Sequence, residues 1–309
     1  MKFVVIPVGV PFLFVVFPFL LSAQNQFQQV GLDIDGEAAS DQLGWSTSLS
    51  ADGKVVAIGA RGNDGNGSNA GHVRIYDLFN GNWTQRGADI EGEASGDESG
   101  YSVSLSPDGN TLVTGAVFNN LATGHARVYD WSGTVWTQRG ADIEGEAVND
   151  QSGCSTSMSS NGRTFAIGAR GNNGNGSNAG QVRVYDWSGS WTQRGADIDG
   201  EASGDNSGFT VALSADGMRV AIGAPFNDGN GSNAGHVRVY EWSKRAWIQV
   251  GMDIDGEMMG DNSGKSVALS ADGNTVAIGA PFNDGSASGA GHVRVYDWNG
   301  NAWVLRGSQ

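Results

Sequence analysis

A unit of about 55 residues is repeated five times in this chain, and this repetition constrains the fold more than any other feature. The segment VAIGARGNDGNGSNAGHVRIYDL at 56–78 recurs almost unchanged as VAIGAPFNDGNGSNAGHVRVYEW at 220–242. Five equivalent glycines, between 53 and 56 residues apart, mark the copies: Gly44, Gly100, Gly153, Gly208 and Gly264. A unit this short cannot cover its own apolar surface, so the copies must stack on one another.

Each copy contains four short segments with strand character. In the fourth copy they are 208–214, 218–224, 236–242 and 246–251. An Asp-Gly or Asn-Gly pair joins the first segment to the second, as expected for a tight hairpin turn that needs positive φ. The second segment is apolar or small on both faces, which is typical of a strand covered on both sides. The fourth begins at a tryptophan and is more polar, as expected at the outer edge of a sheet.

Repeated four-stranded units, together with 49 glycines, predict an all-β fold. We expect a β-propeller of five four-stranded blades, each about 55 residues long, spanning 24–309. The expected repeats are 31–86, 87–139, 140–194, 195–250 and 251–309. A linear β-solenoid is the structural alternative, although its repeats are usually shorter. FQQVG at 27–31 and AWVLRG at 302–307 both resemble the fourth strand, so either one is expected to complete the last sheet and close a ring. The alternative is that the chain forms part of a six- or seven-bladed assembly.

The first 23 residues differ from the rest. Lys2 precedes an apolar run that ends in small residues, the pattern of a secretory signal peptide at 1–23. An uncleaved anchor is the alternative, but three prolines interrupt the run. We therefore predict a secreted, extracellular or surface protein, the periplasm included, with no stable membrane span after cleavage.

Net charge and cysteine content restrict the partners. The formal charge of −15 excludes nucleic acid as a natural ligand, because its phosphates would be repelled. Cys154 is the only cysteine, so no intramolecular disulfide forms.

Acidic residues concentrate in the links that precede the first strand of every copy. Carboxylates at alternate positions of an extended link lie on one side, where they repel each other unless something relieves the repulsion. One interpretation is a calcium ion, which takes hard oxygen ligands; the other is a solvated rim, with some acids paired to Arg86, Arg139, Arg194 and Arg306. The candidate metal ligands are Asp33, Asp35, Glu37, Asp89, Glu91, Glu93, Asp142, Glu144, Glu146, Asp197, Asp199, Glu201, Asp253, Asp255 and Glu257.

Loops rich in amides join the second strand to the third. In a sheet whose strands run up and down, these loops and the acidic links fall on one face. They offer hydrogen-bonding groups to a glycan or protein, although a solvated loop needs no ligand. The candidate ligand-binding residues are Asn63, Asp64, Asn66, Asn172, Asn175, Asn227, Asp228, Asn230, Asn283 and Asp284.

Catalytic motifs are missing from the sequence. Four histidines occupy one repeated position, with Gln181 in the remaining copy, which favours a role in the scaffold. No phosphate-binding glycine loop, HExxH or CxxC pattern occurs. We therefore expect no enzyme activity.

The segment SGKSVALSADGNTVAIGAP at 263–281 resembles the FG-GAP repeats of integrin α-subunit propellers and of secreted microbial proteins. The Gly-Ala-Pro half is intact at 223–225 and 279–281, whereas the Phe-Gly half is altered to Leu-Gly or Ser-Gly. The family's calcium loop between the first two strands is replaced by a hairpin here. The resemblance implies a propeller that binds other molecules.

Together these features predict a non-enzymatic, monomeric binding or adhesion module with an extracellular protein or glycan partner. Two other functions stay open: a propeller hydrolase or lyase acting on extracellular polysaccharide, and a structural envelope module without a dedicated ligand.

Overall fold

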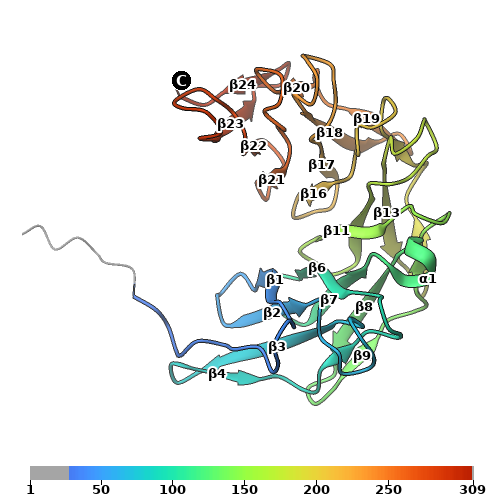
Figure 1. The fold of residues 1–309 in the computed structure, drawn as a ribbon, viewed down its shortest axis with the longest axis vertical. Helices are drawn as coiled ribbons and strands as arrows, with labels where there is room; N and C mark the ends of the chain where they lie inside the picture. The colour runs from blue at the N-terminus through green and yellow to red at the C-terminus, as the bar shows by residue number, and fades with distance from the viewer. Residues whose placement is uncertain (1–27, 308–309) are drawn as a thin grey trace, which may run out of the picture. The chain divides into compact units, whose positions relative to one another are not determined.

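The computed structural model describes residues 28–307, and the predicted signal segment lies outside this range. One compact unit begins at Gly31, and it is built almost entirely of β-strands (Figure 1). Each sequence repeat forms one antiparallel sheet whose four main strands are paired in chain order. In the described part of the chain, no helix is long and apolar enough to cross a membrane.

Each of the five sheets contains four main strands. The first contains β1 (Leu43–Leu49), β2 (Val55–Ala60), β3 (His72–Phe79) and β4 (Asn82–Gln85). The second contains β6 (Ser99–Leu105), β7 (Thr111–Ala116), β8 (His125–Trp131) and β9 (Trp136–Gln138). The third contains β11 (Ser152–Met158), β12 (Thr164–Ala169), β13 (Gln181–Trp187) and β14 (Trp191–Gln193). The fourth contains β16 (Thr210–Leu213), β17 (Arg219–Ala224), β18 (His236–Ser243) and β19 (Ala246–Gln249). The fifth contains β21 (Ser266–Leu269), β22 (Thr275–Ala280), β23 (His292–Trp298) and β24 (Trp303–Leu305).

Small elements that the sequence did not predict complete the fold. Four two-residue strands in the acidic links pair with the third strand of the preceding sheet: β5 (Ile90–Glu91), β10 (Ile143–Glu144), β15 (Ile198–Asp199) and β20 (Ile254–Asp255). A single helical turn, α1 (Asn119–Ala122), lies between the second and third strands of the second repeat. This loop is three residues shorter than its counterparts in the other repeats.

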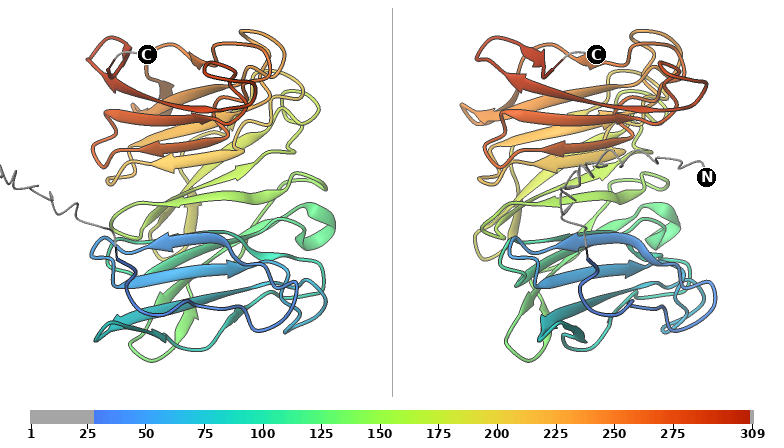
Figure 2. Two further views of the ribbon diagram at one scale, coloured as in Figure 1. Left: turned by 60° about the vertical axis from the view of Figure 1, so that its left-hand side comes forward. Right: turned by 90° about the vertical axis from the view of Figure 1, so that its left-hand side faces the viewer.

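The sheets stack face to face in chain order, with their first strands innermost. The inner strands β1, β6, β11, β16 and β21 contact one another from sheet to sheet, and the two further views show the sheets as successive layers (Figure 2). This arrangement confirms the predicted propeller of five four-stranded blades, and it is not the linear β-solenoid weighed as the alternative.

In the described part of the chain the apolar core consists of four clusters, each shared by two neighbouring sheets. Between the first two sheets, Val73 and Ile75 pack with Val103 and Leu112. Val73 is completely buried, and burying a side chain of this size stabilises the fold by about 1.5–3 kcal/mol. The second strands are buried on both faces, as their composition predicted.

Backbone contact between blades explains one glycine in each of the first four repeats. A Cβ atom at Gly59 would lie 2.1 Å from the carbonyl oxygen of Gly100 in the next blade. The hydroxyl of Ser46 donates a hydrogen bond to the same carbonyl at 2.7 Å. Only a residue without a side chain fits here, so the glycine of the Gly-Ala pair is a packing requirement.

The predicted hairpin turns are confirmed. Gly53 has φ of 71°, and its four counterparts are also in the left-handed region. The hydroxyl of Ser50 and the backbone N–H of Lys54 both donate to one carboxylate oxygen of Asp52, at 2.8 and 3.0 Å. The turn is thus stabilised by its own side chains.

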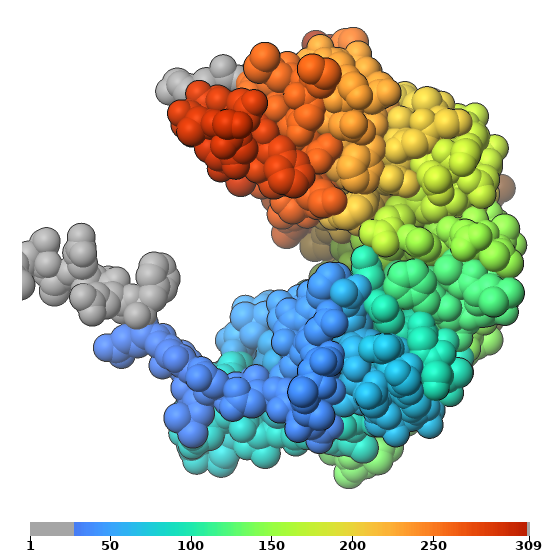
Figure 3. Space-filling view, viewed as in Figure 1, coloured from blue at the N-terminus to red at the C-terminus, as the bar shows by residue number. Residues whose placement is uncertain are grey.

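The first and last sheets each expose a face that is buried in the inner sheets. Val293 is 68% exposed, whereas its counterpart Val237 is completely buried. On the first sheet, Trp45 and Leu49 are 46% and 56% exposed. Figure 3 shows these end sheets in blue and red. The C-terminal candidate for the closing strand forms β24 of the last sheet, while residues 28–30 belong to no strand.

Candidate functional site

The acidic links and the loops between second and third strands do lie on one face. The side-chain amide of Asn66, in such a loop, donates to the carbonyls of Gly92 and Glu93 in the following link, at 2.8 and 3.1 Å. Asn175 and Asn230 make the same pair of bonds in their blades. We call this surface the link face; its links are residues 32–42, 88–98, 141–151, 196–206 and 252–262.

Arginines of the third strands neutralise part of the acidic charge. Arg74 forms ion pairs with Glu37 and with Asp89, the latter at 2.9 Å. Its four counterparts contact the equivalent glutamate: Arg127 with Glu93, Arg183 with Glu146, Arg238 with Glu201 and Arg294 with Glu257, at 3.4 to 3.9 Å. Three of the arginines predicted to pair with the link acids instead pair with an aspartate of the neighbouring third strand. These pairs are Arg139 with Asp130, Arg194 with Asp186 and Arg306 with Asp297.

The repeated histidines lie against the same acids. His72, His125 and His236 are each 1% exposed. Their Nδ1 atoms lie 3.7 to 3.9 Å from carboxylate oxygens: His72 from Asp89, His125 from Glu93 and Asp142, and His236 from Glu201 and Asp253. The scaffold interpretation accounts for their burial but not for their position among carboxylates.

Burial keeps these imidazoles neutral. Desolvation, followed by the charge of Arg127, lowers the pKa of His125 to about 4. Desolvation and Arg238 act on His236 in the same way, also to about 4. Desolvation also lowers the pKa of His72. Near neutral pH each ring therefore offers a nitrogen lone pair to its surroundings.

A further carboxylate lies beside each of these groups of histidine, arginine and acids, which we call the acidic clusters. Glu91 belongs to β5, where buried Ile90 anchors the link. Burial, and then the charges of Asp89 and Glu37, raise the pKa of Glu91. Its Oε2 atom is buried without a hydrogen-bond partner. Glu144 and Asp255 hold the equivalent positions, and burial followed by a neighbouring aspartate raises their pKa values too.

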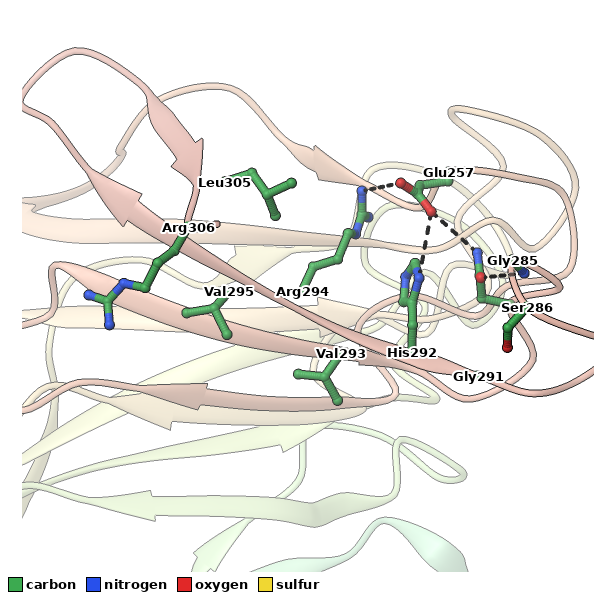
Figure 4. A pocket seen from close by; sticks show the side chains of 11 residues that line it. Glu257, Gly285, Ser286, Gly291, His292, Val293, Arg294, Val295, Leu305 and Arg306 are labelled. Atoms are coloured by element: carbon green, nitrogen blue, oxygen red, sulfur yellow. Dashed lines mark hydrogen bonds and ion pairs between the residues drawn. The ribbon is translucent and has the colours of Figure 1, made fainter. Parts of the chain in front are cut away.

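The fifth cluster is open on one side. Glu257 contacts Arg294 through Oε1 at 3.5 Å and His292 through Oε2 at 3.6 Å (Figure 4). These residues line a hollow of about 540 Å³ that also includes Val293. Among residues 28–307 no further sheet covers β23, which leaves this hollow open.

Most of the predicted loop ligands have a structural role. Asn63 is 5% exposed; its amide group donates to Asp41 at 3.2 Å, and its oxygen accepts from the N–H of Gly65 at 2.8 Å. Asn172, Asn227 and Asn283 are equally buried and make the same bonds. Asp64, Asp228 and Asp284 are exposed, and one oxygen of each accepts a backbone N–H of its own loop. The exposed members, rather than the buried asparagines, are available to a partner.

Sequence reasoning missed a row of cations and aromatic rings at the start of the first strands and the end of the second strands. Arg61 lies 3.3 Å from the ring centre of Trp45 and 5.5 Å from that of Tyr101. Arg170 is 5.7 Å from Tyr101 and 5.4 Å from Phe209, and Lys265 is 4.0 Å from Phe209. We call these six residues the inner ladder: Trp45, Arg61, Tyr101, Arg170, Phe209 and Lys265. The signal was present, because the position after the marker glycine reads Trp, Tyr, Cys, Phe and Lys while the surrounding repeat hardly changes.

The inner ladder carries positive charge that the described residues do not neutralise. Arg61 pairs with Glu98 at 3.1 Å. Arg170 donates to the side-chain oxygen of Gln151 at 2.6 Å, and neither it nor Lys265 has a recorded ion pair within residues 28–307. Burial, followed by the charge of Arg170, lowers the pKa of Lys265. Two cations thus stand together on a protein of formal charge −15.

Exposed apolar side chains also interrupt the repeat on the link face. Leu121 and Val148 are 76% and 51% exposed, and a backbone hydrogen bond joins Asn149 to Leu121. Met258 and Met259 are 63% and 72% exposed in the last link. These two apolar spots occur only in particular copies, so the scaffold does not require them.

Comparison with known proteins finds a similar repeat and supports the fold. Residues 28–76 and 197–240 match the FG-GAP repeat family. A Bacteroides uniformis structure provisionally named a 6-phosphogluconolactonase is similar with a TM-score of 0.56 and 10% identity, covering 85% of this chain and 70% of its own. Hydrazine synthase of Kuenenia stuttgartiensis is similar with a TM-score of 0.56 and 16% identity, covering 88% and 69%. At these identities the likeness extends to the fold alone. No curated protein sequence matches the chain.

Proposed function

Because this chain carries FG-GAP repeats folded as a β-propeller, we propose that it is a non-enzymatic binding module, secreted or surface-exposed, that holds a protein partner on the link face. FG-GAP repeats are typical of extracellular and surface proteins, which supports that location. The more specific part of the proposal is the chemistry of the partner: carboxylates directed at the inner ladder, with apolar groups around them.

The inner ladder is the observation that carries this proposal. Trp, Tyr, Phe, Met and Arg are the residues enriched where proteins bind one another, and Trp, Tyr and Arg dominate the binding energy. Half-buried aromatic rings next to Arg170 and Lys265 provide such a surface. A partner carboxylate at this point would meet two cations that have no acidic partner among residues 28–307.

The apolar spots favour a protein over a glycan. Leu121 with Val148, and Met258 with Met259, present unbranched or branched aliphatic groups to solvent. A glycan has few groups that benefit from such contacts, whereas methionine adapts to varied protein surfaces. The adhesion role predicted from the sequence corresponds to this kind of contact.

Catalysis is the less favoured alternative. A polysaccharide hydrolase or lyase needs an acid pair set apart from the repeated acids. The position after the marker glycine varies among Trp, Tyr, Cys, Phe and Lys and holds no acid, and the nearby Glu98 pairs with Arg61. The structural envelope module remains the other alternative, and it predicts no specific partner.

Calcium is not required by this proposal. The third-strand arginines already neutralise one carboxylate in each cluster. We therefore expect partner binding to survive removal of calcium by a chelator. Loss of binding on chelation would instead support the calcium-dependent version predicted from the sequence.

Binding of the immobilised chain to a panel of purified extracellular proteins and to a glycan array tests the proposal. We expect a protein ligand whose affinity falls at least tenfold in Arg170→Gln and in Phe209→Ala. Phe79→Ser is the matched control, because Phe79 is 69% exposed and ends β3 at the side away from the link face. Ladder variants that bind as well as the control, or ligands found only on the glycan array, would contradict the proposal.

A further inference from the structure

We propose that three of the clusters on the link face each bind one divalent transition-metal ion of the Zn²⁺ type, a role independent of the proposed protein binding. The clusters are Glu37, His72 and Asp89; Glu93, His125 and Asp142; and Glu201, His236 and Asp253. In each cluster one ligand atom from every residue lies within 4.8 Å of the other two.

Buried histidine nitrogens without a partner are the first support. The Nδ1 atoms of His72 and His125 are buried and accept or donate no hydrogen bond. Both side chains are almost completely buried, and both Nδ1 atoms face carboxylates. A buried polar atom without a hydrogen-bond partner destabilises the fold unless something satisfies it, and a metal ion would do so.

The separations suit one shared ion. Two ligands held about 2.0–2.2 Å from a tetrahedral zinc ion lie about 3.3–3.6 Å apart. In the second and third clusters Nδ1 lies 3.7 to 3.9 Å from both acids. In the first cluster it lies 3.7 Å from Asp89, and the ligand atom of Glu37 lies within 4.8 Å. A contraction of a few tenths of an ångström would therefore complete the second and third sites, whereas the side chain of Glu37 would have to move further to complete the first.

Charge gives an independent argument. The second cluster contains Glu93, Asp142 and Glu144 against a single cation, Arg127. Three carboxylates against one guanidinium leave a local formal charge of about −2, which one divalent ion would cancel. Glu93 contacts Arg127 through Oε1 and faces His125 through Oε2, so the arginine and an ion would use different oxygens. Glu201 divides its oxygens between Arg238 and His236 in the same way.

The imidazole selects the type of metal. Calcium and magnesium prefer oxygen ligands only, whereas zinc and its transition-metal neighbours bind imidazole together with carboxylate. A set of one nitrogen and two or more carboxylate oxygens is therefore better suited to Zn²⁺ than to Ca²⁺. This differs from the calcium site predicted from the acids alone.

Two blades serve as internal controls. In the third blade Gln181 replaces the histidine, and its amide donates to Glu146 at 3.1 Å, so the carboxylate is already satisfied. In the fifth blade the side chain of His292 is 25% exposed, and the position equivalent to Asp89 is Gln309. We expect neither blade to bind the ion tightly.

The test counts ions on the full-length, untagged mature chain. Equilibrium dialysis against ZnCl₂ with metal analysis, repeated by isothermal calorimetry, should give three Zn²⁺ per chain. We expect each of three variants to bind one ion fewer: His72→Gln, His125→Gln and His236→Gln. Each variant should still fold, because glutamine already occupies this position in the third blade. Gln181→His should add a fourth ion, and His292→Gln should leave three.

Other results would overturn the assignment. Zn²⁺ stoichiometry unchanged by the three histidine substitutions, or equal binding of Ca²⁺, would mean that the carboxylates alone hold the ion. No binding at all would mean that the groups form only pH-dependent ion pairs. Circular dichroism of each variant checks folding. Partner binding by His125→Gln, measured separately, distinguishes failure here from failure of the proposed function.

Discussion

Replacement of one repeated glycine by alanine should have opposite consequences in two adjacent blades. A Cβ atom at Gly223 would lie 2.1 Å from the carbonyl oxygen of Gly264 in the fifth blade. Ordinary contact begins near 3.4 Å, so the backbone of one sheet must move by about 1.3 Å relative to the other. We expect Gly223→Ala to destabilise the protein by about 1–3 kcal/mol or more.

Gly279 is the matched control, since it holds the same position in the last blade. Its Cβ atom would meet the hydroxyl of Ser266 at 2.3 Å, but no backbone atom of another sheet. That hydroxyl can rotate away, and alanine restricts the unfolded chain, so Gly279→Ala should be neutral or slightly stabilising.

Urea denaturation measures both variants directly, and melting temperature gives a second value at about 2–4 °C per kcal/mol for a chain of this size. An equal loss of stability in the two variants would refute the reasoning. It would mean that the exposed face of the last sheet is covered in solution as the inner faces are.

Two further predictions concern titratable groups. His125 and His236 have a pKa of about 4 in the folded protein, against about 6.5 in the unfolded chain. Between these values the unfolded state binds more protons, so the free energy of unfolding falls as the pH is lowered. From pH 7 to pH 5 the loss is about 2 kcal/mol per histidine. Melts of His125→Gln should show a shallower pH dependence than the parent, and an unchanged slope would contradict the assignment. Burial raises the pKa of the Cys154 thiol, so a maleimide should label it only after unfolding, whereas rapid labelling of the native protein would show that the site is open.

Most of the fold could be predicted from the sequence because each repeat contains the same turn residues and the same pattern of apolar positions. Asp-Gly turns, second strands that are apolar on both faces and a terminal tryptophan all reappeared where the pattern placed them. The tryptophan of the fourth strand also joins blades, since Trp136 donates through Nε1 to the carbonyl of Arg86 at 2.9 Å. Such bonds between repeats have no signature within one repeat.

The site was predicted less completely for a related reason. The acids of the links were recognised, but their arginine partners were placed on the fourth strand, whereas Arg74 and its counterparts lie on the third. Pairing of β5 with β3 brings the link back against that strand, and a two-residue strand leaves no periodic signal. Buried Asn63 was proposed as a ligand because its loop looked solvated, yet Asp41 holds it inside.

The inner ladder was missed because its residues lie where the repeats differ. Reading for repetition selects what the copies share, and Trp45, Tyr101, Phe209 and Lys265 stand where they differ. Proximity across blades, not spacing along the chain, brings Arg170 between two aromatic rings. A search for variable positions in an otherwise uniform repeat would have found it.

Calorimetric titration with two short peptides, one of glutamates and one of lysines, tests the central claim most directly. The claim predicts that the glutamate peptide binds despite the chain's charge of −15, that salt weakens this binding, and that Arg170→Gln combined with Lys265→Gln abolishes it. Binding of the lysine peptide alone would show that the acidic links, and not the inner ladder, attract partners, and it would contradict the account.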